Sequence, residues 1–251
     1  MHRMRLKWTD TSTSGRKRIL ARTAFLPSLG MGLLAGTLAV SMIFGSAAAD
    51  EGPGARSLFD GEGLDGWTTF SSSDGSVDHP DAWTVDGGLL TTKGTPLGYI
   101  QTSEEFENFK LLVEWRWPPG KQPGKGGILV RISGDDMIWP RSLEAQINHP
   151  DAGDFWGLNG YNLDGPADRK QELDHPKFGH LINLRRTADA EKPSGQWNRY
   201  EIVARGDTVD LILNGRHVNR ATGCDVLRGP VALTAEGDAI QFRRVEIIEL
   251  K

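Results

Sequence analysis

Cysteine is almost absent from this 251-residue chain, which has only Cys224. No intramolecular disulfide can form, so an apolar core must stabilise the fold, and a chain of this length is long enough to bury one. Cys224 lies in Thr222-Gly223-Cys224-Asp225, with no histidine close in sequence. We therefore predict a structural role for this thiol rather than that of a nucleophile.

Basic residues are scarce beyond the N-terminal segment. Without the seven Lys/Arg and the one Asp of residues 1–49, the 29 basic and 33 acidic residues become 22 and 32, a net charge of −10. No cluster of Lys/Arg offsets this charge, and an acidic surface repels nucleic acid and anionic membranes. We expect neither nucleic acid nor, once the N-terminal segment is removed, a membrane among the partners.

The first 49 residues have the order of a secretory signal peptide. Seven Lys/Arg precede an almost uncharged stretch, which ends in Ala47-Ala48-Ala49 before Asp50. Small residues of this kind precede the cleavage site of signal peptidase. We expect a signal peptide at residues 1–49 and one domain at residues 50–251, located in the periplasm or secreted. A retained membrane anchor is the alternative, because about 20 apolar residues span a bilayer.

Sustained helical periodicity is also missing, and apolar residues instead alternate with polar ones, which is typical of β-strands. Odd-numbered residues of 109–117 are apolar and form one face of a predicted strand. Residues 142–148 continue the pattern, with Leu143, Ala145 and Ile147 facing inward and Ser142, Glu144, Gln146 and Asn148 facing the other way.

Two further patterns predict how the C-terminal strands are joined and shaped. Asn214-Gly215, between two alternating runs, predicts a hairpin. The final run, residues 240–250, shifts its phase between Phe242 and Val245, which predicts a β-bulge in a strand that closes a sheet edge. Residues 150–181 show no strand period and predict a long loop, of a length that is usually functional. Together these patterns predict an all-β fold, a single β-sandwich of two antiparallel sheets.

Several motifs follow one another along the chain: Ser57-Leu58-Phe59-Asp60-Gly61, Phe109–Arg116, Gly126-Gly127-Ile128, Leu143–Ile147, Gly229–Leu233 and Ile240–Val245. Their order resembles the 3-keto-disaccharide hydrolase family. The resemblance covers residues 50–251 and implies a concanavalin-like jelly roll with a sugar-sized groove on its concave face. It also implies cleavage of the glycosidic bond of 3-keto-glycosides, by hydrolysis or by elimination followed by hydration. Gly126 and Thr234 depart from the family pattern, in which Asn and Gln are common at these positions.

Glu144 is the only acid on the polar face of the strand at residues 142–148. A retaining glycosidase needs two carboxyl groups about 5 Å apart, so the second would have to come from Glu114 or Glu236 on another strand. A 3-keto sugar requires less, because the ketone acidifies the hydrogen on C2 and lets the substituent on C1 leave. We therefore predict Glu144 as the acid–base residue, with His149 as a further candidate base.

The ketone oxygen needs a cation, a hydrogen-bond donor or a metal as negative charge develops on it. Arg131 and Gln146 are the predicted catalytic partners of Glu144 in this role, although Arg131 could instead neutralise Glu114 or Glu144. The predicted substrate-binding residues are Glu114, Asn148, Trp156, Tyr161 and Glu236. Trp156 and Tyr161 could stack on sugar rings or pack in the core, whereas Trp67, Trp83, Trp115 and Trp197 are predicted core residues.

Metal and phosphate sites have little support in the sequence. His149, His175 and His180 lack a tight ligand spacing, so a divalent metal is possible but no ligand set is assigned. Gly124-Lys125-Gly126-Gly127 resembles a phosphate-binding loop only superficially, because no Gly-Lys-Ser/Thr ending follows. The predicted partner is a saccharide substrate. A non-catalytic carbohydrate-binding module and an ordinary glycoside hydrolase on the same fold are the alternatives.

Overall fold

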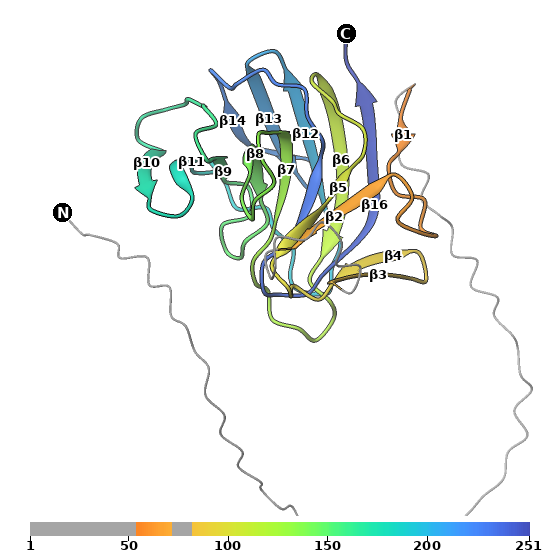
Figure 1. Ribbon diagram of the computed structural model, residues 1–251. Coiled ribbons are helices and arrows are strands. Elements are labelled where there is room, and N and C mark those ends of the chain that lie inside the picture. Colours follow the sequence, from red (N-terminus) through yellow and green to blue (C-terminus); the bar gives the residue numbers. More distant parts are fainter. Residues whose placement is uncertain (1–53, 72–81) are drawn as a thin grey trace, which may run out of the picture. The chain divides into compact units, whose positions relative to one another are not determined.

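Alternating apolar residues build two antiparallel sheets in the computed structural model (Figure 1). The structure describes residues 54–71 and 82–251, and the predicted signal peptide and its cleavage site lie outside them. In sheet order, sheet A consists of β14 (Arg216–Ala221), β13 (Thr208–Leu213), β12 (Asn198–Arg205), β6 (Phe109–Arg116), β16 (Ile240–Glu249), β4 (Leu89–Thr92) and β3 (Trp83–Asp86), and β1 (Arg56–Ser57) also pairs with β16.

Sheet B carries the strand of Glu144. Its order is β10 (Lys170–His175), β11 (Gly179–Leu184), β9 (Phe155–Leu158), β8 (Arg141–Gln146), β7 (Gly127–Ser133), β15 (Ala232–Ala235), β5 (Gly98–Thr102) and β2 (Trp67–Ser71). Among the described residues, no helix is long and apolar enough to cross a membrane.

One large apolar core fills the space between the two sheets. All odd-numbered residues of 109–117 are buried in it, as are Leu143, Ala145 and Ile147, so the inward faces predicted from the alternation are confirmed. A smaller apolar cluster, which includes Leu129, Leu158 and Leu181, lies on the outer face of sheet B. The prediction of an all-β sandwich of two antiparallel sheets is confirmed.

The hairpin and the bulge are also confirmed. Asn214 and Gly215 both have positive φ, 53° and 80°, as the two-residue turn between β13 and β14 requires. The register of β16 against β6 shifts between Phe242 and Arg244. The predicted edge position was wrong, because β16 lies between β6 and β4 in the interior of sheet A. Interior and edge strands of an antiparallel sheet share the same alternation, so the pattern alone did not distinguish them.

The predicted long loop at residues 150–181 was also wrong, because it contains β9, β10 and the start of β11. Gly157 interrupts the pattern of β9, and a Cβ at this position would lie 2.4 Å from the carbonyl oxygen of Tyr161. β10 is mostly exposed at the edge of sheet B, so its side chains are largely polar and show no apolar period. The prediction that this segment packs on the domain is confirmed by the burial of Phe155, Leu158 and Tyr161.

Three of the four tryptophans predicted for the core are buried: Trp67, Trp83 and Trp115. Trp197 is only partly buried, and the guanidinium groups of Arg116 and Arg243 each lie 4.4 Å from its ring centre. Trp197 precedes β12, where it packs against charged side chains rather than against the core. Its core prediction was therefore wrong.

Candidate functional site

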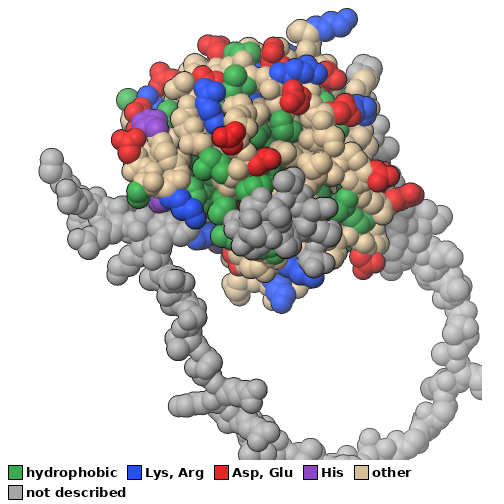
Figure 2. Space-filling view, viewed as in Figure 1, with side chains coloured by type: hydrophobic (Ala, Val, Ile, Leu, Met, Phe, Trp, Pro, Cys, Tyr) green, Lys and Arg blue, Asp and Glu red, His purple; other side chains and the backbone are tan. Residues whose placement is uncertain are grey.

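The outer face of sheet B presents Ser142, Glu144 and Gln146 from β8, on the side away from Leu143 and Ala145. Glu144 pairs across the sheet with Leu129 of β7 on one side and Trp156 of β9 on the other. Figure 2 views the domain as in Figure 1 and shows hydrophobic side chains in the middle of the visible face, with many charged side chains toward its rim. Glu144 is only 6% exposed.

A second carboxyl group, that of Glu236, lies close to Glu144. Burial raises the pKa of Glu144 well above its usual range, and the neighbouring charge of Glu236 raises it further. Burial also raises the pKa of Glu236, whereas the Thr234 hydroxyl and the charge of Lys125 act in the opposite direction. We call Glu144 and Glu236 the carboxyl pair. Glu144 is thus the member that favours the protonated form, and Glu236 has groups that favour its ionised form.

Hydrogen bonds connect Glu236 to the start of β7. The Gly127 amide donates to the Thr234 hydroxyl oxygen (2.6 Å), and that hydroxyl donates to Oε1 of Glu236 (2.8 Å). The Gly126 amide donates to Oδ1 of Asn148 (2.7 Å), and the Lys125 amide to Oδ2 of Asp238 (3.1 Å). The loop before β7 therefore holds both the chain around Glu236 and the end of β8.

Two glycines in this loop leave space for carboxyl groups. A Cβ at Gly127 would lie 2.2 Å from Oε1 of Glu144, and one at Gly124 would lie 2.1 Å from the Asp238 carboxyl carbon. No other residue type fits beside these groups without displacing them. This close packing explains the glycines at positions 124 and 127 of the Gly-Lys-Gly-Gly sequence.

Arg131, predicted to bind substrate, does not reach the carboxyl pair. It is fully buried, and its guanidinium group donates to the backbone carbonyls of Glu107 (2.9 and 3.1 Å), Gly206 (2.8 Å) and Asp225 (3.0 Å). A register shift after Val130 and a positive φ of 55° at Arg131 turn the side chain away from the regular alternation. The predicted contact with substrate was therefore wrong, and so was its pairing with a glutamate.

Two predicted substrate-binding residues also lie elsewhere. Tyr161 is fully buried, and its hydroxyl donates to the carbonyl of Asp225 (2.7 Å), so it is a core residue. Glu114 belongs to β6 in the other sheet, where Arg243 Nε binds its carboxylate at 2.5 Å. Strand alternation gives each residue a face but not a sheet, which is why Glu114 was misplaced.

Gln146 and Trp156 lie beside Glu144, and Asn148 follows the end of β8, where its Oδ1 accepts the Gly126 amide. Gln146 lies two residues after Glu144 on the same face, and its backbone carbonyl accepts the Tyr200 hydroxyl (2.6 Å). Trp156 is partly buried opposite Glu144, and its Nε1 has no hydrogen-bond partner among the described residues. These three residues and the carboxyl pair form the candidate site.

The histidines contact residues other than the carboxyl pair. His149 binds Glu191 (2.8 Å), His180 binds Asp174 (2.8 Å), and His175 stacks on Phe178. Within residues 54–71 and 82–251, no three His, Cys, Asp or Glu side chains are grouped so that they could hold a metal ion. Cys224 is buried, and this burial raises the pKa of its thiol to about 12.

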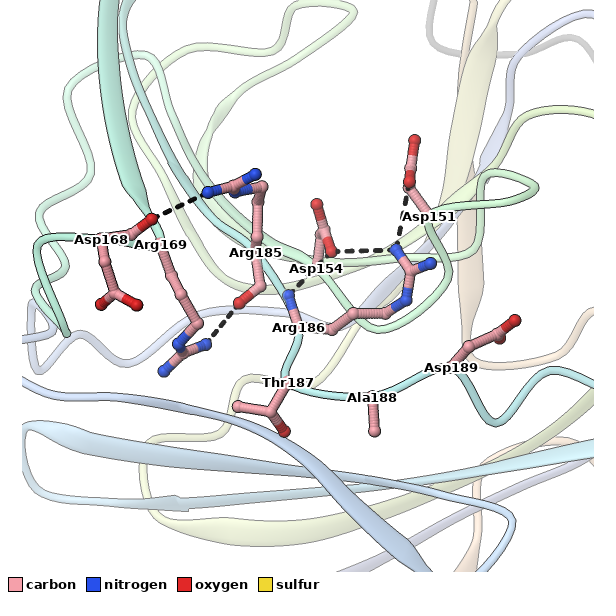
Figure 3. Close-up of a pocket in the computed structure, with 9 residues that line it drawn as sticks. All are labelled: Asp151, Asp154, Asp168, Arg169, Arg185, Arg186, Thr187, Ala188 and Asp189. Carbon is pink, nitrogen blue, oxygen red and sulfur yellow. Dashed lines mark hydrogen bonds and ion pairs between the residues drawn. The ribbon is translucent and has the colours of Figure 1, made fainter.

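A charged pocket that the sequence analysis missed lies beside the end of β8 (Figure 3). The backbone amide of Gln146 donates to the backbone carbonyl of Asp154 (3.0 Å), and Asp154 lines this pocket. Its volume is about 480 Å³, within the range of small-molecule sites. Its lining residues are mostly charged: Asp151, Asp154, Asp168, Arg169, Arg185, Arg186, Thr187, Ala188 and Asp189.

Fixed contacts orient the charged groups of this pocket. Figure 3 shows Arg186 between Asp151 (3.1 Å) and Asp154 (3.4 Å), and Arg185 donating to the carbonyl of Asp168 (2.8 Å). Burial raises the pKa of the Asp154 carboxyl group. The signal in the sequence was the pair Arg185-Arg186 and the aspartates of 150–181, but only the pairing of β9 with β11 brings them together.

Comparison with known proteins identifies the family and the fold of this chain. The family model of the 3-keto-alpha-glucoside-1,2-lyase-like domain matches residues 54–248, which confirms the resemblance seen in the sequence. Among curated proteins, none matches this chain.

Similar solved structures include a protein from Parabacteroides distasonis assigned as a glycosyl hydrolase, with 20% identity, coverage of 79% of this chain and 94% of that one, and a TM-score of 0.56. They also include the carbohydrate-binding module CBM66 from Bacillus subtilis, with 15% identity, coverage of 73% of this chain and 96% of that one, and a TM-score of 0.51. A third is a non-specific endo-beta-1,3(4)-glucanase, with 13% identity, coverage of 80% of this chain and 93% of that one, and a TM-score of 0.51. The fold is thus the concanavalin-like β-sandwich that the resemblance implied.

Proposed function

Because the chain belongs to the family of 3-keto-alpha-glucoside-1,2-lyase-like domains, we propose that it is an exported enzyme that cleaves the glycosidic bond of 3-keto-glycosides. One observation carries the proposal: two carboxyl groups, Glu144 and Glu236, lie together on the outer face of sheet B, and each has a raised pKa. Carboxyl groups with perturbed pKa values are typical of acid–base sites. Fold similarity alone would not assign an activity.

The two members of the carboxyl pair suit two different steps. Ionised Glu236 removes the proton from C2 of the 3-keto sugar, and the electrons of the C2–H bond pass to the ketone oxygen as an enolate. They then form a double bond between C1 and C2. The bond from C1 to the leaving oxygen breaks, and protonated Glu144 donates its proton to that oxygen. Addition of water to the double bond then completes net hydrolysis. The sequence predicted Glu144 as the acid–base residue, and within that role its environment favours proton donation.

The remaining residues of the site position the substrate in this proposal. Gln146 offers amide donors on the face of Glu144, where they suit the ketone oxygen as negative charge develops. Trp156 offers an aromatic surface opposite Glu144. The charged pocket is lined by other residues than the candidate site. Its carboxylates accept and its guanidinium groups donate hydrogen bonds, which suits the hydroxyl groups of a saccharide.

The test is incubation of the purified domain with a chromogenic 3-keto-glucoside and with its parent glucoside, each with and without a chelator. We expect release of the chromophore from the keto sugar only. Release from the parent glucoside at a similar rate would identify an ordinary glycoside hydrolase, and binding without release would identify a carbohydrate-binding module. Loss of activity with chelator, restored by a divalent cation, would assign a metal to the reaction.

Export is part of the proposal. Basic, apolar and Ala-rich segments follow one another in residues 1–49, as in a secretory signal peptide. We expect the purified protein to begin near Asp50 and to be found in the periplasm or the medium. N-terminal sequencing checks this, and an intact Met1 in the membrane fraction would contradict it.

A further inference from the structure

The outer face of sheet A carries a second pocket, on the opposite sheet from the carboxyl pair. Its volume is about 390 Å³. Three cationic side chains, Lys192, Arg199 and Arg243, line it together with Trp197. This concentration of positive charge is unusual in a domain whose net charge is −10 without residues 1–49. Nothing in the proposed reaction uses it.

The bulge in β16 is what brings Arg243 to this pocket. Phe242 and Val245 are both buried in the core, so the core-facing positions change from even-numbered to odd-numbered residues across the bulge. Arg243 is exposed on the outer face, where it lies over Trp197 together with Arg116. Bulges commonly re-aim side chains in this way near functional sites. The indole holds both guanidinium groups in place.

Hydrogen-bond donors in the pocket wall remain unused. Nε of Arg199 and Nδ2 of Asn198 are buried and have no hydrogen-bond partner among the described residues. Asn198 itself is only 1% exposed, while its Oδ1 accepts from the Lys192 amide (2.8 Å) and so fixes its side chain. Unpaired buried donors cost free energy. Because both are N–H groups, the wall of this pocket has more donors than acceptors to satisfy them.

The two carboxylates of the pocket already have cationic partners. Arg243 binds Glu114 at 2.5 Å, and Lys110 binds Glu201 at 2.6 Å. Arg199 lies farther from Glu201, at 3.7 Å. The cationic charge of Lys192 has a backbone carbonyl, that of Trp197, as its partner (3.0 Å). The pocket therefore has positive charge in excess, with carboxylate oxygens beside it that could accept from hydroxyl groups.

We propose that this pocket binds the carboxylate group of an acidic sugar, at a site separate from the carboxyl pair. The planar guanidinium groups of Arg199 and Arg243 match a planar carboxylate. Glu114 and Glu201 lie where they can accept hydrogen bonds from the hydroxyl groups of the sugar. The volume suits a ligand larger than a lone carboxylate. The site acts in attachment to acidic saccharide and takes no part in bond cleavage.

Calorimetric titration of the purified domain with glucuronate, glucose and acetate, at constant ionic strength, tests the proposal. We expect saturable binding of glucuronate, with glucose and acetate at least about tenfold weaker, because each lacks half of the recognised groups. Arg199→Gln and Arg243→Gln should each weaken glucuronate binding about tenfold. Arg220→Gln removes the same charge from an exposed position on β14 and should leave binding unchanged.

Turnover of the 3-keto-glucoside and the melting temperature are measured on the same variants. Both should be unchanged in Arg199→Gln, because Arg199 lies 3.7 Å from its partner Glu201. This variant therefore remains informative even if Arg243→Gln destabilises the fold by removing the partner of Glu114. Equal affinity for glucuronate and acetate, or equal weakening by Arg220→Gln, would overturn the proposal. Because binding and turnover are separate readouts, a failure of the proposed reaction leaves this test intact.

Discussion

The outward carboxyl groups of the two sheets have different surroundings. On sheet A, Glu114 and Glu201 are bound by Arg243 and Lys110 at 2.5 and 2.6 Å. On sheet B, burial and the charge of Glu236 raise the pKa of Glu144. A cationic partner stabilises the ionised form, whereas burial beside a second carboxyl group stabilises the protonated form. The surroundings of a glutamate, rather than its place in an alternating strand, therefore decide whether it is held in an ion pair or, like Glu144, has a raised pKa.

The largest effect should come from exchanging a glutamate for glutamine on each sheet in turn. Glu144→Gln keeps the shape of the side chain but removes the transferable proton, so turnover of a 3-keto-glucoside should fall by about 10²–10⁴. Glu114→Gln, the matched control on sheet A, should leave turnover unchanged. Initial rates and melting temperatures of both variants check this comparison. Equal activity of Glu144→Gln and the unmodified protein would remove Glu144 from the mechanism.

Crowding the carboxyl pair should have the next largest effect. In Gly127→Ala, the new Cβ would meet Oε1 of Glu144 at 2.2 Å and displace the carboxyl group. Since a displacement of about 1 Å costs roughly 10²-fold in rate, we expect a loss of that order, with destabilisation of about 1–3 kcal/mol. Gly63→Ala, where a Cβ meets nothing within 4 Å, is the control. Full activity of Gly127→Ala would show that the position of Glu144 is not critical.

A smaller effect should appear as a shift of the pH–rate profile. The Thr234 hydroxyl donates to Glu236 and lowers the pKa of that carboxyl group. Thr234→Val removes this donor, so the pKa of Glu236 should rise and the acidic limb of kcat/KM should move to higher pH. The basic limb, assigned to loss of the proton from Glu144, should move less. An acidic limb at the same pH in both proteins would exclude Glu236 as the base.

The smallest expected effect concerns stability. The folded protein holds the Glu144 proton more tightly than the unfolded chain, whose glutamate pKa is about 4.3. This contribution is fully present below the unfolded pKa and is lost as the pH rises through the raised folded pKa. Glu144→Gln has no such proton to lose, so its melting temperature relative to the unmodified protein should increase from pH 4 upward. A difference independent of pH would contradict the raised pKa.

Much of the fold followed from alternation and turn chemistry. Leu143 and Ile147 face the core because successive strand residues point to opposite sides. The Asn214-Gly215 turn followed from the positive φ that both positions require. Residues 170–175 escaped prediction because they form an edge strand with little burial and so show no apolar period. The interior position of β16 depends on long-range pairing, which no local pattern encodes.

The site was predicted only in part, for a related reason. Glu144 and Gln146 were identified because they share one strand face, and that relationship is local. The proximity of Glu236 to Glu144 depends on β15 pairing with β7, and β7 with β8, across about 90 residues of sequence. Arg131 was misassigned because the irregularity after Val130 breaks the alternation on which its prediction rested. A single shifted register thus changes a predicted ligand-binding side chain into an internal one.

That internal arginine has a consequence for how the domain assembles. The guanidinium of Arg131 is bonded to carbonyls from three connections: Glu107 before β6, Gly206 between β12 and β13, and Asp225 after β14. A fully buried cation is tolerable only while these dipoles surround it. A chain that ended before Asp225 would lack one of these acceptors, so burial of the Arg131 guanidinium group would be less favourable than its hydration. Both sheets must therefore be joined before this side chain is stable inside, which makes closure of the sandwich a cooperative step involving most of the sequence.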